Sequence, residues 1–244
     1  MPTERRVTLR AGRLWYAKQY VPLRGSAPSS QRRERREYSS EIRESINFRT
    51  SIEKLWLLLE CNFKPNDLYV SFSYRPDMLP KTKSDAEKYL KQFIRALRQE
   101  RKPLMADLLY VYATEGYHSD NRFHHHMILN AAGNDYAVIR SLWSRYGDNI
   151  EILPYRCKTA LAHAEYLTKE PRERGRHRVG ERMWRTSRNL KRPIVVFEDV
   201  PAGEKLTVPQ NARVVKDKNV NNVFGRFQYV AAILEPDIEN TDLG

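Results

Sequence analysis

The chain has 244 residues, of which 41% are hydrophobic, enough to bury the core of one globular domain with extensions. Its 43 Lys and Arg residues outnumber 30 Asp and Glu residues, so the formal net charge is +13, which favours polyanionic partners such as nucleic acids. Two cysteines are too few for a disulfide framework, and no stretch is long and apolar enough to span a bilayer. We therefore expect a soluble, cytoplasmic protein with no membrane association.

The first 66 residues are expected to precede the main domain. Residues 6–21 contain two β-type runs around Gly12, which predict a hairpin within a basic N-terminal segment, residues 1–36. The polar and basic end of that segment has no periodicity and is interpreted as a linker or arm. Apolar residues then recur at helical spacing between Ser40 and Asn62, so one or two helices are predicted in a lead-in of residues 37–66.

The central residues 67–170 contain most of the predictable elements. Strands are expected at residues 67–74, 108–117, 123–130 and 149–155, and helices after Ser84, after Asp135 and at residues 158–170. Ser84 and Glu87 have the spacing of a capping box, and Asp135 is a suitable N-cap residue. The order strand, helix, strand, strand, helix, strand, followed by a helix, predicts an α+β fold with a ferredoxin-like or RRM-like antiparallel sheet.

Three histidines stand next to one another on the strand expected at residues 123–130. Side chains alternate along a strand, so His124 and His126 share one face and His125 lies on the other. Glu115 lies on the same face as His124 and His126 if the numbers of two directly opposed residues in the predicted hairpin add up to an odd value, for instance with residue 115 opposite residue 124 or 126. Two imidazoles and a carboxylate suit a divalent ion that also binds phosphate oxygens, Mg²⁺ or Mn²⁺. The alternative is a chance cluster on an exposed strand, and His118, in the expected turn, is interpreted as a surface residue.

A second group lies on the helix expected at residues 158–170. Tyr166 lies off the apolar stripe of this helix, with His163 three residues before it and Lys169 three residues after it. A phenol can attack a phosphodiester but is largely protonated at neutral pH. Lys169 could help by favouring the phenolate or by neutralising charge on the phosphate, whereas an ordinary helix surface is the alternative interpretation.

Residues 171–244 form the last expected segment. Nine Arg or Lys residues lie between Arg172 and Arg192, with Trp184 among them, a composition typical of a surface that follows a phosphate backbone. A solvated flexible segment is the alternative, and residues 194–200 predict one strand. No GxxxxGK[ST] motif is present, so we expect no fused helicase, and unwinding would require a host helicase.

The sequence FHHHMIL at residues 123–129, followed by AEYLTKE at residues 164–170, resembles the HUH endonucleases of rolling-circle replication. More closely, DLYVSFSY, DAEKYLKQFIRALRQERK, HHHMILN and TSRNLKRP are similar to replication initiators of bacterial plasmids, prophages and related mobile elements. The similarity extends from about Asn47 to Pro193.

The resemblance implies an enzyme that nicks and rejoins single-stranded DNA at a replication origin. It implies that His124 and His126 are metal ligands, with Glu115 as the third, and that Tyr166 is the nucleophile, assisted by Lys169. Members of the family keep the 5′ end as a phosphotyrosine and leave a 3′ hydroxyl for a host polymerase. A non-catalytic RRM-like nucleic-acid-binding protein, and a transposase or relaxase with the same chemistry, are the alternatives.

The sequence departs from the family pattern at two positions. His125 stands where the motif usually has a hydrophobic residue, so a ligand pair that includes His125 stays open. Ala162 stands where two-tyrosine members have their first tyrosine. A single tyrosine implies that strand closure uses Tyr166 again, a second protomer or water, so the oligomeric state stays open.

Overall fold

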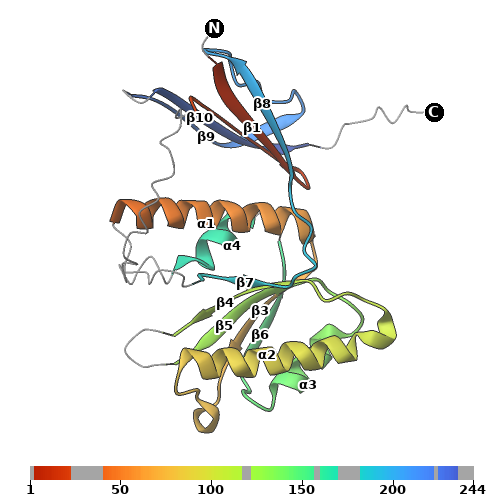
Figure 1. Ribbon diagram of the computed structural model, residues 1–244. Coiled ribbons are helices and arrows are strands. Elements are labelled where there is room, and N and C mark those ends of the chain that lie inside the picture. The colour runs from red at the N-terminus through yellow and green to blue at the C-terminus, as the bar shows by residue number, and fades with distance from the viewer. Residues whose placement is uncertain are drawn as a thin grey trace, which may run out of the picture. The chain divides into compact units, whose positions relative to one another are not determined.

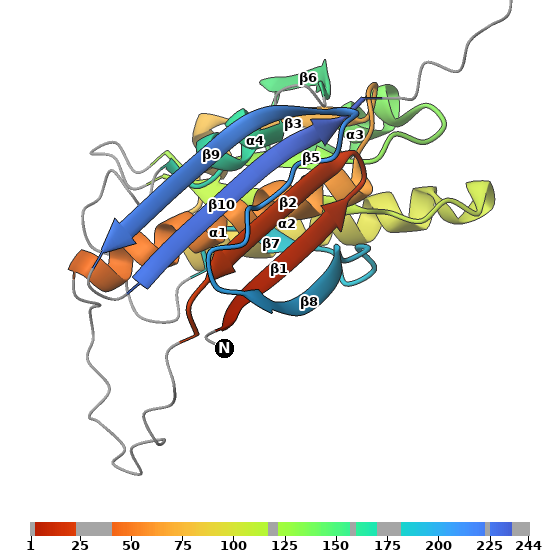
Figure 2. The same cartoon turned by 90° about the horizontal axis from the view of Figure 1, so that it is seen from above.

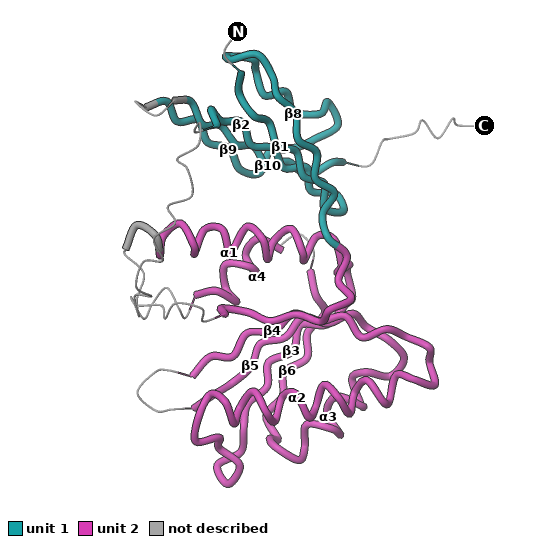
Figure 3. Tube along the Cα trace, in the orientation of Figure 1, with its two compact units in different colours: residues 1–35, 192–244 teal, residues 36–191 magenta. Residues whose placement is uncertain are grey.

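The computed structural model describes residues 3–22, 41–116, 122–156, 160–169, 182–222 and 225–235. The chain divides into two compact units, residues 1–35 with 192–244, and residues 36–191 (Figure 3). The described residues form two antiparallel five-stranded sheets and four α-helices, so the expected α+β class is confirmed. In the described part of the chain, none of the helices combines the length and apolarity that crossing a membrane requires.

The first unit is a sheet built from both ends of the chain. Its strands have the order β8-β1-β2-β10-β9 (Figure 2), and they are β1 (Thr3–Ala11), β2 (Leu14–Tyr20), β8 (Ile194–Pro201), β9 (Ala212–Asn222) and β10 (Gly225–Leu234). The hairpin expected around Gly12 is confirmed, since β1 and β2 are paired and Gly12 has a φ of 54°. β1 also pairs with β8, with Arg5 opposite Asp199, a pairing that no pattern in the sequence indicates.

The second unit contains all four helices of the described residues and the other sheet. Its elements are α1 (Glu41–Asn62), β3 (Leu68–Ser73), α2 (Lys83–Glu100), β4 (Tyr110–Glu115), β5 (His124–Leu129), α3 (Asp135–Trp143), β6 (Ile150–Pro154), α4 (Ala160–Tyr166) and β7 (Arg185–Thr186), with short 3₁₀ helices at Pro76–Met78 and Lys102–Leu104. The sheet has the order β6-β3-β5-β4-β7, and all neighbouring strands are antiparallel.

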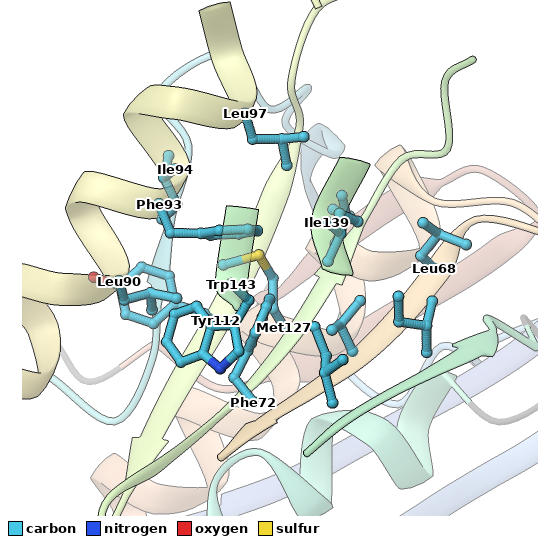
Figure 4. Close-up of a cluster of buried hydrophobic side chains, with 14 of the residues drawn as sticks. Leu68, Phe72, Leu90, Phe93, Ile94, Leu97, Tyr112, Met127, Ile139 and Trp143 are labelled. Atoms are coloured by element: carbon cyan, nitrogen blue, oxygen red, sulfur yellow. The ribbon is translucent and has the colours of Figure 1, made fainter. Parts of the chain in front are cut away.

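The hydrophobic core lies between one face of this sheet and the helices α2 and α3, which cover that face (Figure 1). β3 alternates between buried and half-buried residues, because Leu68, Val70 and Phe72 point into this core. Trp143 of α3 lies in the same cluster, with its ring centroid 4.6 Å from that of Phe72 and 5.6 Å from that of Phe93 (Figure 4). Replacing such a buried aromatic residue with Ala typically costs about 3–5 kcal/mol, so this layer contributes strongly to the stability of the unit.

The opposite face of the sheet lies toward α1 and α4 (Figure 1). α1 is one continuous helix of 22 residues, where one or two helices were expected, and it packs against α4. Trp184 donates a hydrogen bond from Nε1 to Ser51 Oγ at 2.9 Å, and Asn62 donates one to the carbonyl oxygen of Lys191 at 2.9 Å. These bonds attach the segment that precedes and follows β7 to α1.

The start of α2 differs from the expected capping box. Thr82 is the N-cap, since its hydroxyl accepts a hydrogen bond from the backbone N–H of Asp85 at 3.1 Å. Ser84 therefore lies inside the first turn. Glu87 is not a cap residue, because its carboxylate pairs with Arg185 of β7 at 3.0 Å. The prediction was wrong by two residues because Thr82 and Ser84 are both chemically suitable caps.

The start of α3 also differs from the prediction. Asn134 is the N-cap, and Asp135 is the first helical residue. The carboxylate of Asp135 is used elsewhere, since it binds the buried guanidinium of Arg101 at 2.6 Å and accepts from the backbone N–H of Ala132 at 2.7 Å. Asp135 thus neutralises the buried guanidinium of Arg101 instead of capping the helix, because a buried charge without a partner is costly.

Candidate functional site

The pairing of β4 with β5 decides which side chains share a face. Glu115 is opposite His124 and Ala113 is opposite His126, so the expected odd parity is confirmed. Gly116 follows with a φ of 146°, and a Cβ atom there would overlap the ring of Phe123. The paired part of the two strands therefore ends with Glu115 and His124. The turn that was expected to contain His118 lies outside the described residues.

Glu115, His124 and His126 form a compact group of potential metal ligands. One ligand atom from each residue lies within 4.8 Å of the others. Oε2 of Glu115 is 3.1 Å from Nε2 of His124 and 3.6 Å from Nε2 of His126. Oε1 of Glu115 is buried and has no hydrogen-bond partner among the described residues. Because an unsatisfied buried carboxylate oxygen is costly, this donor set fits a metal ion.

The charge state of Glu115 suits a ligand. Burial raises the pKa of this carboxyl group, but hydrogen bonds with His124 and His126 and the electrostatic influence of His126 and Lys169 outweigh burial. The pKa of Glu115 is therefore held well below its usual range, and the group remains an anion.

Two hydroxyl groups on β3 orient the ring of His126. Nδ1 of His126 lies 2.9 Å from the hydroxyl oxygen of Tyr69 and 3.1 Å from that of Ser71. The ring of Tyr69 is also stacked on that of His126, with centroids 5.9 Å apart. A His that ligates a metal through Nε2 carries its proton on Nδ1, and these oxygens can accept that proton's hydrogen bond.

Tyr69 and Ser71 were not identified from the sequence. The available signal was strand alternation, because Leu68, Val70 and Phe72 point to the core and leave Tyr69 and Ser71 on the face of His126. Burial, with further contributions from Tyr166 and Glu115, raises the pKa of Tyr69 and keeps its hydroxyl neutral.

His125 lies on the opposite face of the sheet. It is fully buried, with Nε2 2.7 Å from the hydroxyl oxygen of Tyr74 and Nδ1 2.9 Å from that of Thr114. Burial and the neighbouring histidines lower the pKa of His125 to about 3, so the ring is neutral. Both ring nitrogens are thus used inside the core, and the alternative of a ligand pair that includes His125 has no geometric support.

Tyr166 lies at the end of α4, next to the three potential ligands. Its hydroxyl oxygen is 3.3 Å from Nε2 of His126, and its side chain is partly exposed. α4 is shorter than the helix expected at residues 158–170, although residues 157–159 and 170 are outside the described part. Of its expected apolar stripe, Ala160 and Ala164 are buried, as is Leu167 directly after α4, whereas Leu161 is half-buried.

Lys169 connects the tyrosine with the carboxylate. Its Nζ is 3.8 Å from the centroid of the Tyr166 ring and 3.5 Å from Oε2 of Glu115. Burial lowers the pKa of Lys169, but the hydrogen bond with Tyr166 and the charge of Glu115 outweigh burial, so the pKa is raised. Lys169 is therefore a cation beside the phenol.

His163 is not part of this group, because its ring contacts Tyr69 and Tyr155 at centroid distances of 5.3 and 5.1 Å.

In the described part of the basic C-terminal segment, Arg185 and Trp184 are engaged within the fold, whereas Arg182, Arg188, Lys191 and Arg192 are exposed. Arg185 pairs with Glu87, and the indole N–H of Trp184 is bound by Ser51, so neither is simply a solvated surface residue. The remaining arginines between residues 170 and 181 lie outside the described residues.

Five residues singled out in the sequence, Glu115, His124, His126, Tyr166 and Lys169, therefore meet in one place. The arrangement combines a potential metal site, a partly exposed phenol and a cation. Compared with known proteins, the chain matches no family, no curated protein and no solved structure.

Proposed function

We propose that this protein is a metal-dependent endonuclease and strand transferase that cuts and rejoins single-stranded DNA at a replication origin. The observation that carries the proposal is the position of the Tyr166 hydroxyl, 3.3 Å from Nε2 of His126. A nucleophile beside a potential metal site is an arrangement suited to metal-assisted cleavage of a phosphodiester. The net charge of +13 supports a polyanionic substrate.

The topology of the second unit supports the same proposal. The sheet order β6-β3-β5-β4, with α2 and α3 on one face, agrees with the ferredoxin-like or RRM-like arrangement. Because several functions share that fold, we base the proposal on the site.

Glu115, His124 and His126 would hold the metal, and Mg²⁺ or Mn²⁺ best suits phosphate chemistry. The unsatisfied Oε1 of Glu115 and the mixed oxygen and nitrogen donors fit such an ion. A bound ion would polarise a phosphate oxygen. Three protein donors also leave coordination positions for the substrate.

In the proposed cleavage, Oη of Tyr166 forms a bond with phosphorus while the bond between phosphorus and the 3′ oxygen of the preceding nucleotide breaks. The phenol loses its proton to solvent, which the partly exposed side chain can reach, and the released 3′ oxygen takes up a proton. Lys169, a cation 3.8 Å from the phenol ring, stabilises negative charge as it develops. Rejoining is the reverse attack by a 3′ hydroxyl.

In this role the protein starts rolling-circle replication of a mobile element. The 3′ hydroxyl primes synthesis by a host polymerase, and a host helicase supplies the unwinding. Transposition or conjugation would use the same cleavage chemistry on a different substrate.

The decisive experiment is a search for a covalent adduct. The full chain is incubated with Mn²⁺ and a pool of single-stranded oligonucleotides that contain a randomised segment and a 3′ label, and the products are separated under denaturing conditions. We expect a labelled protein adduct, because the 3′ part of the cleaved strand stays attached to Tyr166.

The matched controls are Tyr166→Phe and the wild-type protein in EDTA, both of which should give no adduct. A pool that binds the wild-type protein but never forms an adduct would favour the non-catalytic binding protein and overturn the proposal. An adduct that persists in Tyr166→Phe would assign the nucleophile to another residue.

A further inference from the structure

A pocket of about 220 Å³ lies beside the potential metal site in the second unit. It is lined by Tyr69 of β3, Leu153 and Pro154 of β6, Arg156, and His163 of α4. Pockets for complete drug-sized ligands are typically about 300–1,000 Å³. This pocket is smaller, so it suits a single flat ring system.

The lining residues favour an aromatic ring attached to a negative charge. The rings of Tyr69 and His163 have centroids 5.3 Å apart, and the side chains of Leu153 and Pro154 complete an apolar wall. Arg156 supplies a cation, and none of the five lining residues is acidic. Proteins that bind single-stranded nucleic acids use this combination, because bases stack on aromatic rings while cations hold the backbone.

The pocket adjoins the site formed by Glu115, His124, His126, Tyr166 and Lys169, because Tyr69 belongs to the lining of the pocket and also contacts His126. The hydroxyl oxygen of Tyr69 lies 2.9 Å from Nδ1 of His126. His163 and Tyr166 are three residues apart on α4, so they lie on neighbouring turns of one helix. A base in the pocket would thus leave its own backbone close to Tyr166.

We propose that this pocket binds one unpaired nucleobase of the DNA strand, at a position adjoining the phosphate that Tyr166 attacks, and thereby sets the base preference at that position. Arg156 contacts the phosphate of the same nucleotide. The inference rests on the proposed function for its place in the reaction, whereas nucleotide binding by the pocket is testable without catalysis.

The first test measures binding of dAMP, dCMP, dGMP and dTMP by saturation-transfer difference NMR, without metal. Leu153→Trp fills the pocket from the sheet edge, and Leu79→Trp is the matched control, because Leu79 is 41% exposed, Leu153 is 45% exposed and Leu79 does not line the pocket. We expect base-proton signals for at least one nucleotide. In Leu153→Trp the indole occupies the space of the base, so the base loses its stack on the lining rings and affinity should fall by roughly 5- to 150-fold, whereas Leu79→Trp should bind as the wild-type protein does.

The second test sequences the covalent adducts and released strands from the randomised pool. The wild-type protein should show a preferred base at one position adjoining the cut, and Leu153→Trp should reduce that preference to the random level. His163→Ala, which removes one ring, is the second variant if Leu153→Trp does not fold.

The outcomes separate the two proposals. If the wild-type protein forms no adduct but binds a nucleotide in a manner that Leu153→Trp abolishes, the proposed function fails and the nucleotide pocket stands. If adducts form and the folded pocket variants keep the wild-type base preference, the function stands and the pocket proposal is wrong. Absence of nucleotide signals in the wild-type protein, or equal signals in Leu153→Trp and Leu79→Trp, also overturns the pocket.

Discussion

The hydroxyl oxygen of Tyr166 lies 3.3 Å from Nε2 of His126, although the two residues are 40 positions apart and belong to α4 and β5. The buried side chains of Ala160 and Ala164 anchor α4, and the hydroxyl groups of Tyr69 and Ser71 orient the histidine. The proposed nucleophile and the potential ligand are therefore both positioned in the absence of substrate, as the proposed strand cleavage would require.

Removal of either histidine ligand should weaken metal binding without comparable loss of DNA affinity. In His124→Ala and His126→Ala we expect Mn²⁺ affinity to fall at least about 100-fold, since the loss of an outer-shell partner alone costs about 10–100-fold. DNA affinity should stay nearly constant because it depends on distributed positive charge. Mn²⁺ titration followed by electron paramagnetic resonance measures the first quantity, and fluorescence anisotropy with labelled DNA measures the second. Unchanged Mn²⁺ affinity in both variants would show that the ligand assignment is wrong.

The two hydroxyl groups at Nδ1 of His126 should act as partial substitutes for each other. Tyr69→Phe and Ser71→Ala each leave one oxygen near Nδ1, so each should weaken Mn²⁺ binding only slightly. The double variant leaves the Nδ1 proton without either partner and should lose about 10–100-fold in Mn²⁺ affinity. A double-mutant cycle of Mn²⁺ titrations measures this coupling. Additive small effects would mean that these hydroxyl groups do not orient the ligand.

Much of the site was accessible from the sequence because strand alternation is a local property. The spacing of His124 and His126 and the parity of Glu115 needed only a two-residue period and a hairpin. Tyr69 was missed for a different reason, since its role depends on β3 pairing with β5, so that Ser71 is opposite His126. No local pattern determines which strands are neighbours in a sheet.

The sheet of the first unit shows the same limit more strongly. The hairpin around Gly12 was predictable from its turn, and residues 194–200 were predicted as a strand. Their pairing places Arg5 opposite Asp199, and the two side chains form an ion pair at 3.1 Å. The register of two segments so distant in the chain is set by tertiary packing, for which the single sequence carries no periodic signal.

His125 should matter for stability and not for metal binding. His125→Ala removes a fully buried ring and leaves the hydroxyl groups of Tyr74 and Thr114 without it, at a cost of about 2–4 kcal/mol in the free energy of unfolding. His124→Ala is the matched control, because its partly exposed side chain should cost less than about 1 kcal/mol. Urea unfolding compares the two, and Mn²⁺ titration of the folded protein should show that His125→Ala still binds. A folded His125→Ala protein that binds no Mn²⁺ would indicate instead that His125 is one of the metal ligands.

Lys169 should have opposite effects on metal binding and on catalysis. Its ammonium group is 3.5 Å from Oε2 of Glu115, the carboxylate expected to hold the metal, so it competes with a divalent ion for the same negative charge. Lys169→Met should therefore bind Mn²⁺ at least as tightly as the wild-type protein. The same variant loses the cation beside Tyr166, and the single-turnover rate of adduct formation should fall roughly 100-fold, with partial recovery in Lys169→Arg, which keeps the charge. A purely structural role would instead lower the free energy of unfolding and leave the rate of the folded fraction unchanged. The opposite signs of the two effects thus separate a lysine that assists the tyrosine from one that only supports the fold.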